Sequence, residues 1–500
     1  MQLQHLFYGM WLNLVEHLVW DQVVAGSNPV IPTIFECQLS LIDSLFFTTM
    51  STNQHKKWFF FTFYIIINLN DNKRKRFTME FISQISEDEY ESFMQENKET
   101  SHFLQSLEWM KVSEYKGLIA HLVGVRKNKK LIATALLLQK KLPLGYSYFQ
   151  IPRGFTMDYN NLELLEFFTK EINQYTKKFK SIYVKIDPDL KLHNLEHNGN
   201  VLDGENNYNL VQYMQELGYK HLGYNKFFER SYPRYTFRIN LEDDIETITS
   251  RFHQSSRQRI KKAETFGVKV YEGTLDDVKK FYDLMVKTEK KKDFYSHNLD
   301  FYKYFYQTFK EKNHVTLYVA EINIDETNLK IENELKKLNE ELENGTNLNK
   351  NQKQTLNKQI EGYEKSKQEF IDIKNEMGNN IVLSSYMIVK YGEKCWTLYS
   401  CNEPKVRNAY GNYLIYKNQV IDAHNEGFKI FDAFGTIGDP KSDKSLVGLH
   451  EFKKKFGGEY IEFIGEFDFI QKKLVYLLFT KLVPYYRKFI NKQLKRKTSN

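Results

Sequence analysis

The residues best suited to chemistry in this chain are clusters of cations. Arg257, Arg259, Lys261 and Lys262 crowd one short stretch. On a helix, positions 257 and 261 share a face, and so do positions 259 and 262. Cations held this close repel one another unless an anion lies between them, and phosphate groups would meet that need. The alternative interpretation is a basic face that is only solvated.

A second cluster is the run Lys453-Lys454-Lys455, preceded by Phe452 and followed by Phe456 and Gly457. A lysine ammonium can stabilise the oxyanion that develops during acyl transfer, or contact the phosphates of a nucleic acid. The residues alone favour a solvated run over either role.

The sequence RGFTMD at 153–158 follows a strand-like segment and would form a loop. Gly154 would let the backbone approach a ligand closely. Asp158 could orient a substrate hydroxyl or accept a proton from an amine. A turn or a helix N-cap explains this aspartate equally well.

Other kinds of catalytic centre find no support. No Ser/His/Asp or Cys/His constellation is evident, and no cysteine and histidine spacing typical of zinc occurs, so we expect neither a metal nor another cofactor. Cys395 and Cys401 flank a β-like WTLYS run and are interpreted as buried core residues. With three cysteines the chain cannot be a disulfide scaffold and suits a reducing compartment.

The elements that must position these residues follow a mixed α/β pattern. Strands are predicted within 122–142, 181–188, 236–241, 268–273, 315–324, 381–391 and 428–434. Helices are predicted at 161–179, at 246–266 with Gly267 as its end, and at 410–425. Since the same alternation occurs twice over similar lengths, the sequence favours a duplicated fold.

Residues 325–378 have a different pattern. Ile331, Leu335, Leu338 and Leu342 are spaced at four, three and four residues, and the spacing resumes at Leu356 after a turn-like ENGTNLN. This predicts an antiparallel coiled-coil arm inserted into a sheet. The arm carries nine lysines and twelve acids, so it is either a solvated spur or touches RNA through shape and a few local lysines.

Composition excludes several classes. The 500 residues are 41% apolar and include 33 Tyr and 38 Phe, which excludes disorder throughout. The formal charge of +8 is uneven: residues 471–500 contribute +9, residues 1–78 contribute +1, and residues 79–470 contribute −2. The pattern of residues 471–500 predicts amphipathic helices that lie on an anionic membrane surface. The alternative is a C-terminal docking helix with a frayed basic end.

The first 78 residues differ from the rest. Gly26-Ser27-Asn28-Pro29 is compatible with the T-arm consensus of a transfer-RNA gene, so this stretch is interpreted as non-native, disordered upstream sequence, with the start at Met79. The competing interpretation is a signal peptide or an anchor around the apolar run 58–69. That run lacks a small-residue cleavage site before Met79 and is too short to span a bilayer.

Five motifs in order resemble those of one family. They are FLQSLEWMKV (103–112), YFQIPRGFTMDY (148–159), IYVKIDP (182–188), SSRQRIKKAETFGVKV (255–270) and LHEFKKKFGGEYIEFIGE (449–466). Together they resemble the FemA/FemB/FemX/MurM family of peptidoglycan bridge-forming aminoacyltransferases.

The resemblance implies an α/β (α+β) fold of two tandem GNAT-like acyltransferase domains with the coiled-coil hairpin inserted. The first domain would span 79–235, the second 236–324 and 379–470, the arm 325–378 and the basic tail 471–500. An enzyme of this family moves an amino acid from aminoacyl-tRNA to the stem-peptide amine of a peptidoglycan precursor, either lipid II or UDP-MurNAc-pentapeptide. It would work in the cytoplasm, with peripheral contact to the inner face of the plasma membrane.

By the same resemblance, Lys453 and Asp158 would be catalytic. The residues expected to bind substrate are Lys111, Arg153, Gly154, Arg257, Lys261, Tyr399 and Tyr410. Lys455 stands where the family often has glycine, so which lysine points inward is left open, and Phe155 replaces the usual proline.

Two other functions stay open at this point. One is an N-acyltransferase of the same fold that uses coenzyme A or another donor. A loop that cradles the pyrophosphate of coenzyme A needs several glycines at tight spacing. The stretch that resembles such a loop has only Gly411, which argues against the use of coenzyme A. The other is a non-catalytic scaffold that binds tRNA or membrane.

Overall fold

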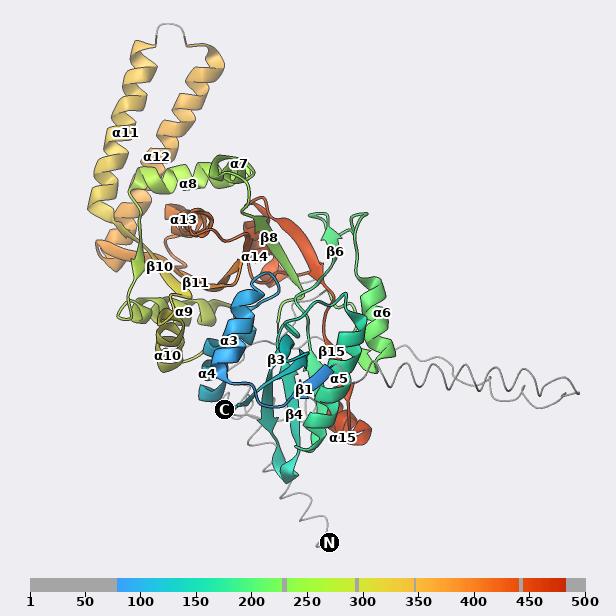
Figure 1. Cartoon of the computed structure of the whole chain (residues 1–500). Helices are drawn as coiled ribbons and strands as arrows, with labels where there is room; N and C mark the ends of the chain where they lie inside the picture. The colour runs from blue at the N-terminus through green and yellow to red at the C-terminus, as the bar shows by residue number, and fades with distance from the viewer. Residues whose placement is uncertain (1–78, 227–231, 293–295, 346–347, 440–443, 483–500) are drawn as a thin grey trace, which may run out of the picture.

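The computed structural model describes residues 79–226, 232–292, 296–345, 348–439 and 444–482. The interpretation of residues 1–78 and the larger part of the basic tail therefore lie outside the described residues. The described chain forms two mixed β-sheets with helices packed against them, and a long helical arm projects from one end (Figure 1).

The first sheet has seven strands in the order β1-β2-β3-β4-β5-β15-β7. Their bounds are β1 Met79–Ile82, β2 Ile119–Lys127, β3 Lys130–Lys141, β4 Ser147–Ile151, β5 Ser181–Ile186, β7 Tyr219–His221 and β15 Phe467–Ile470. Neighbouring strands are antiparallel except β4 and β5, which are parallel. Helix α5 (Leu162–Lys177) joins this parallel pair and buries its apolar face, as the helical spacing predicts.

The second sheet has eight strands in the order β6-β14-β8-β13-β12-β11-β10-β9. Their bounds are β6 Lys191–Leu195, β8 Tyr235–Asn240, β9 Lys269–Gly273, β10 Val315–Asn323, β11 Asn380–Tyr391, β12 Lys394–Asn402, β13 Ile430–Asp432 and β14 Glu459–Phe463. Here β12 and β13 form the single parallel pair, and helix α13 (Gly411–Asn425) joins them.

The two sheets repeat one plan. Strands β1 to β5 and strands β9 to β13 each lie in sequence order, and in both sets only the last pair is parallel. Two helices connect the first and second strands of each set: α3 (Glu87–Glu96) and α4 (Leu107–Tyr115), and α9 (Val278–Lys292) and α10 (Leu299–Lys310). The predicted duplication is therefore confirmed, and so is the predicted α/β fold class.

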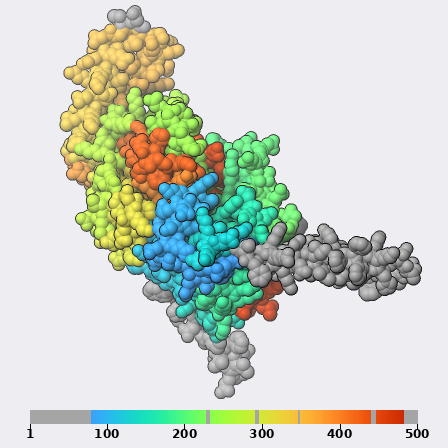
Figure 2. Space-filling view, viewed as in Figure 1, coloured from blue at the N-terminus to red at the C-terminus, as the bar shows by residue number. Residues whose placement is uncertain are grey.

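The arm interrupts this plan at one connection. Helices α11 (Ile324–Asn344) and α12 (Lys350–Met377) lie between β10 and β11, whereas β2 and β3 are joined by a tight turn at Asn128 and Lys129. At the base of the arm Phe370 packs edge-on against Phe266, with ring centroids 5.2 Å apart. The helical hairpin is thus confirmed, and Figure 2 shows that it projects well beyond the body.

One predicted helix is broken. In place of a continuous helix over 246–266 the structure has α7 (Ile245–Ser250) and α8 (Gln254–Phe266). Phe252 is buried between them. His253 leaves the helical conformation, and its ring nitrogen accepts a hydrogen bond from the Ser255 amide. Burial of one aromatic ring and a new N-cap together outweigh a continuous helix. Gly267 ends the helix as predicted, and it does so in the left-handed conformation.

Each sheet also takes a strand from the other half of the chain. Strand β15, near the C-terminus, lies between β5 and β7, while β6 pairs with β14 at the edge of the second sheet. These two exchanges tie the halves together. The domain boundary between residues 235 and 236 stays a prediction.

Candidate active site

Lys453 is the lysine of its run that points inward. It lies on α14 (Lys444–Lys454), its residue is only 6% exposed, and its Nζ donates hydrogen bonds to the carbonyl oxygens of Gly435 at 2.5 Å and Phe434 at 3.1 Å. Lys454 instead lies near the surface, with its Nζ 3.5 Å from Oε1 of Glu451, and Lys455 is partly exposed. The structure thus holds a buried ammonium just beyond the end of β13.

The residues around Lys453 explain its motif. Phe452 packs against Tyr413, and Phe456 packs against Tyr416, so two aromatic rings anchor α14 on α13. Gly457 follows with φ of +73°, and a Cβ there would lie 2.7 Å from the backbone oxygen of Arg251. The motif therefore consists of an inward cation, two anchors and a glycine that no side chain can replace without movement.

We expect Gly457→Ala to destabilise the protein by about 1–3 kcal/mol, because the left-handed conformation and the contact with Arg251 both oppose a Cβ. Gly448→Ala is the matched control, since Gly448 lies within α14 with open space around it. That change should be neutral or stabilising by up to about 1 kcal/mol. Urea unfolding measures both, and equal effects would contradict this account of Gly457.

Helix α8 divides its cations into two pairs. Arg259 donates to the Tyr413 hydroxyl and lies over that ring at 5.0 Å, while Lys262 lies 5.9 Å from the Tyr363 ring of the arm. Arg257 and Lys261 are exposed, and among the described residues neither side chain makes a hydrogen bond or ion pair. The expected faces therefore exist, with one pair holding the helix and the other exposed to solvent.

Helix α8 begins beside the end of α14. The His253 amide donates to the Lys455 carbonyl at 2.9 Å, and the Arg257 amide donates to the His253 carbonyl at 3.2 Å. Arg257 thus lies one helical turn from a residue bonded to the Lys453–Gly457 segment. The segments that carry Arg257 and Lys453 therefore lie side by side.

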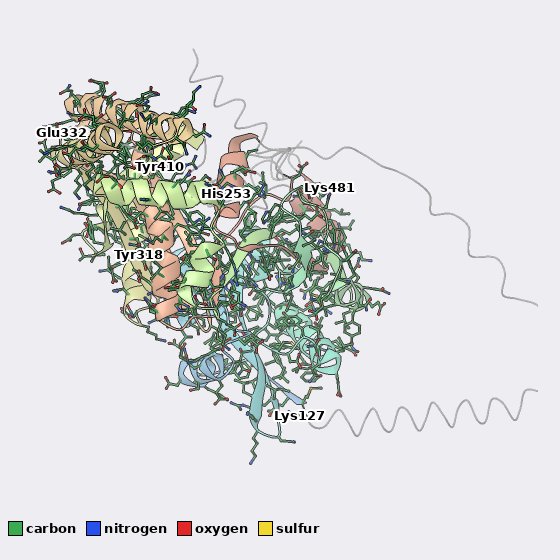
Figure 3. All side chains as sticks on the ribbon, turned by 90° about the horizontal axis from the view of Figure 1, so that it is seen from above. Lys127, His253, Tyr318, Glu332, Tyr410 and Lys481 are labelled. Carbon is green, nitrogen blue, oxygen red and sulfur yellow. The ribbon has the colours of Figure 1, made fainter. Side chains whose placement is uncertain are left out.

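Tyr410 and Gly411 form the start of α13. Tyr410 adopts a left-handed conformation with φ of 56°, and the Arg259 guanidinium lies 5.8 Å from its ring centroid. Figure 3 shows Tyr410 near α8, at whose beginning His253 lies. A Cβ on Gly411 would lie 2.9 Å from that of Leu383, so this glycine lets α13 approach the sheet closely.

The loop at 153–158 faces the protein rather than solvent, except at its end. Arg153 is 6% exposed, donates from Nη2 to the Pro233 carbonyl and stacks 4.6 Å from the Phe463 ring. Gly154 has φ of +82°, and a Cβ there would lie 2.9 Å from Cα of Pro188. Asp158 is exposed, and its carboxylate accepts from the Asn160 amide, which is the geometry of a turn. The catalytic role of Asp158 stays a prediction.

A buried charge network lies beside this loop. Asp189 accepts hydrogen bonds from Arg238 at 2.6 Å and from Lys394 at 3.0 Å, and Arg238 also bonds Asp432 at 2.8 Å. Burial raises the pKa of the Asp189 carboxyl, but Arg238 and Lys394 outweigh that effect and hold its pKa well below the usual range. Since β5 leads to Asp189 while the other three residues lie on β8, β12 and β13, the network connects the two sheets.

This network links the loop to Lys453. The guanidinium groups of Arg153 and Arg238 both lie against the Phe463 ring. Asp432, bonded to Arg238, accepts from the Phe434 amide at 2.8 Å, and the Phe434 carbonyl accepts from Lys453. The loop at 153–158, which follows β4 of the first sheet, and Lys453, which lies beside β13 of the second sheet, are thereby fixed relative to each other.

Two other expected substrate residues differ in their exposure. Lys111 is exposed on α4, between β1 and β2 of the first sheet. Tyr399 is partly buried on β12 and packs edge-on against Tyr302 and Phe305 of α10. Burial raises the pKa of the Tyr399 hydroxyl well above its usual value. Its environment is that of a core aromatic residue, and substrate binding by Lys111 or Tyr399 stays a prediction.

An aromatic cluster beside the network contains a histidine that sequence reasoning missed. His102 is 2% exposed, its ring lies 4.4 Å from that of Trp396, and Nδ1 accepts from the Leu104 amide at 3.0 Å. Burial lowers the pKa of His102 well below 6.5, opposed by Asp189 and reinforced by Arg153. His102 is therefore neutral in the native protein at neutral pH.

A neutral buried histidine makes stability depend on pH. Below about pH 6.5 the unfolded chain takes up a proton at His102 that the native state does not take up. The free energy of unfolding therefore decreases as the pH is lowered. We expect the difference in unfolding free energy between the native sequence and His102→Asn to shrink by up to about 1.4 kcal/mol per pH unit below pH 6.5. Asparagine keeps an acceptor for the Leu104 amide. Urea unfolding between pH 5 and 8 measures the difference, and a constant value would contradict burial of a neutral imidazole.

Metal and membrane-spanning features are not seen in the described part of the chain. Within it, no three histidine, cysteine, aspartate or glutamate side chains gather in a way that would hold a metal ion. None of its helices combines the length and apolar character needed to cross a bilayer.

The described chain thus combines a duplicated α/β fold, a buried lysine and an inserted helical arm. The family model described as the FemAB family matches residues 85–483, and the chain belongs to that family. The resemblance inferred from the five motifs is confirmed, and with it the prediction of an aminoacyltransferase.

Individual relatives are similar to this chain over most of its length. The "Lipid II:glycine glycyltransferase" of Staphylococcus aureus strain MRSA252 is 25% identical over 429 residues, covering 83% of this chain and 99% of the relative. "Aminoacyltransferase FemA" of Staphylococcus epidermidis is 29% identical over 381 residues, covering 73% and 90%. The solved structure titled "Crystal structure of FemX" superposes with a TM-score of 0.64 at 25% identity, covering 80% of this chain and 99% of that one.

Proposed function

We propose that this protein transfers an amino acid from aminoacyl-tRNA to the side-chain amine of a peptidoglycan stem peptide, extending the interpeptide bridge. The observation that carries the proposal is the buried ammonium of Lys453, held at the end of β13 in a chain of the FemAB family. The relative named for lipid II and glycine supports a lipid-linked acceptor. The protein would act in the cytoplasm, at the inner face of the plasma membrane.

The reaction needs placement and charge more than a nucleophile. The amine nitrogen attacks the ester carbonyl carbon, the tetrahedral oxyanion collapses, and the ribose oxygen leaves with a proton that comes ultimately from the amine. An aminoacyl ester is already activated, so alignment and oxyanion stabilisation supply the rate. Lys453 provides the fixed positive charge for that oxyanion. A buried cation acts more strongly than a solvated one because the surrounding dielectric constant is low.

The exposed cations on α8 supply binding. Arg257 and Lys261 project from one face and have no described partner, so they are available to a pyrophosphate or a phosphate backbone. Lys111 would add a further contact to the precursor. Because α8 also packs against the base of the arm through Phe266 and Phe370, a substrate bound on α8 lies close to the arm.

The test is direct transfer by the purified full chain. We would incubate it with lipid II together with charged tRNA, using tRNA charged with glycine, alanine or serine in three separate reactions. The mass of the acceptor is then measured. A gain of one aminoacyl residue with one of these donors supports the proposal. Absence of product with every donor, while the staphylococcal glycyltransferase works in parallel, would refute it.

The alternative of a coenzyme A-dependent acyltransferase is testable in the same assay. Gly411 lies against Leu383 and Ala320 of the sheet, which argues against a phosphate-binding loop at this position. Adding acetyl coenzyme A in place of charged tRNA should give no product. Binding of tRNA without any transfer would instead favour the non-catalytic scaffold.

A further inference from the structure

An exposed apolar surface lies at the end of the body opposite the arm. Helix α15 (Lys473–Leu477) continues into one turn of π-helix, η5 (Leu478–Leu482), and carries three outward leucines. Leu474 is 78% exposed, Leu477 47% and Leu478 54%. Leu144, in the connection between β3 and β4, is 63% exposed.

The two segments that carry these leucines share one anchoring cluster. Tyr476 is 5% exposed, donates to the Asp468 carboxylate at 2.8 Å and packs edge-on against Tyr183 of β5. Leu142 and Tyr146, on either side of Leu144, pack into the same cluster as Val475 and Phe479. The leucines are therefore held facing outward by a rigid base on the first sheet.

The polar groups around this surface are predominantly cationic. Residues 140–146, 177–180 and 470–482 together contain eight lysines and no acid. The Lys472 ammonium lies 5.8 Å from the Tyr146 ring, and the Lys220 ammonium lies 5.6 Å from the Tyr476 ring, which brings cations to both segments. Residues 483–500, which follow directly, carry six further Lys or Arg and no acid.

The neighbouring carboxylates are neutralised inside the protein. Glu466 and Asp468 both lie within 3.2 Å of the Lys185 ammonium, and each is largely buried. Burial lowers the pKa of Lys185, but Asp468 and Glu466 outweigh that effect and raise it. The charge presented outward is therefore that of the lysines.

We propose that α15, η5 and the Leu144 loop form a docking surface for an anionic lipid bilayer. Outward leucines inside a ring of lysines match a membrane interface, where side chains enter the acyl boundary and ammonium groups pair with lipid phosphates. A soluble partner protein would need opposite charge and a complementary apolar groove. The proposal rests on the proposed function in one respect, since a membrane-borne acceptor makes such docking useful.

The surface leaves the arm free. In Figure 1 α11 and α12 extend from the end of the molecule opposite α15, and in Figure 3 Glu332 of the arm and Lys481 lie at well-separated places. A protein bound to lipid through α15 therefore keeps the arm directed away from that contact. Its exposed α8 cations, Arg257 and Lys261, are not part of that contact.

The test is co-sedimentation of the full chain with vesicles. We would compare phosphatidylcholine vesicles with vesicles that also contain phosphatidylglycerol, using two variants of exposed residues: Leu474→Ser/Leu477→Ser/Leu478→Ser, and Lys473→Glu/Lys481→Glu. We expect the native sequence to bind only the anionic vesicles and each variant to bind about tenfold more weakly or less. Leu329→Ser and Lys336→Glu, both exposed on the arm, are the matched controls and should bind normally.

Two further readouts separate the possible failures. Turnover of soluble UDP-MurNAc-pentapeptide should be the same in the native sequence and in the α15 variants, whereas turnover of lipid II in vesicles should fall with binding. Equal vesicle binding by native and variant chains would overturn the docking proposal, even if both acceptors are used. If the native chain binds vesicles and the α15 variants do not, but the native chain transfers no amino acid to either acceptor, the docking proposal is upheld and the proposed function is refuted. Concentration-dependent dimers that dissociate in the leucine variant, without lipid binding, would assign the surface to a second copy instead.

Discussion

Lys453→Met should lower the rate constant of amino-acid transfer by about 10²–10³-fold, with little change in the affinity for aminoacyl-tRNA. Methionine keeps most of the side-chain volume but removes the ammonium that bonds the Gly435 and Phe434 carbonyls. A charge that acts on the developing oxyanion lowers the barrier without adding to ground-state binding. Single-turnover kinetics at saturating acceptor, with tRNA binding measured separately, give the two quantities.

The control is Lys454→Met, one position along the same helix. Lys454 lies near Glu451 at the surface, so its removal should change transfer less than about threefold. Loss of two buried hydrogen bonds also lowers the stability of Lys453→Met by about 1–3 kcal/mol, so urea unfolding must show the variant folded under assay conditions. Equal transfer rates in a folded Lys453→Met and the native sequence would remove Lys453 from the mechanism.

Asp189→Ala should be the most destabilising single change in the charge network, by about 3–5 kcal/mol. The substitution leaves Lys394, buried on β12, without its carboxylate, and leaves Arg238 with Asp432 alone. An uncompensated buried cation costs more than the pair itself contributes. Urea unfolding followed by circular dichroism measures the loss.

Glu376→Ala is the matched control for that change. Glu376 pairs with Lys405 at the surface, where both side chains are more than half exposed, so its loss should cost less than about 1 kcal/mol. Similar losses for the two variants would mean that the network between the sheets contributes no more than a surface ion pair does.

Local patterns predicted much of the fold. Period-two segments gave the strands, helical spacing gave α5, and the leucine spacing after Ile324 gave the arm. The break between α7 and α8 could not be predicted in this way. It depends on burial of Phe252 against Phe456, two hundred residues further along the chain. A local pattern contains no information about such a contact.

The candidate site was predicted less completely. The cationic spacing on α8 indicated two faces, and the structure shows which pair is exposed. Arg238 and Asp189 were missed because a charged residue within or just after a strand resembles a solvated one until its partners on other strands are known. Their signal was weak but present, because Arg238 stands among the apolar and β-branched residues 235–239 of its strand. Lys453 could be distinguished from Lys454 and Lys455 only by tertiary burial.

The central claim is that the amine attacks the RNA-borne ester directly, beside a buried lysine charge and without an enzyme-bound intermediate. Intact-mass spectrometry of the acceptor and of the protein, quenched during a single turnover, tests it most directly. The account predicts an acceptor heavier by one aminoacyl residue and a protein of unchanged mass at every time point. An aminoacyl adduct on the protein that forms before product and then decays would contradict it.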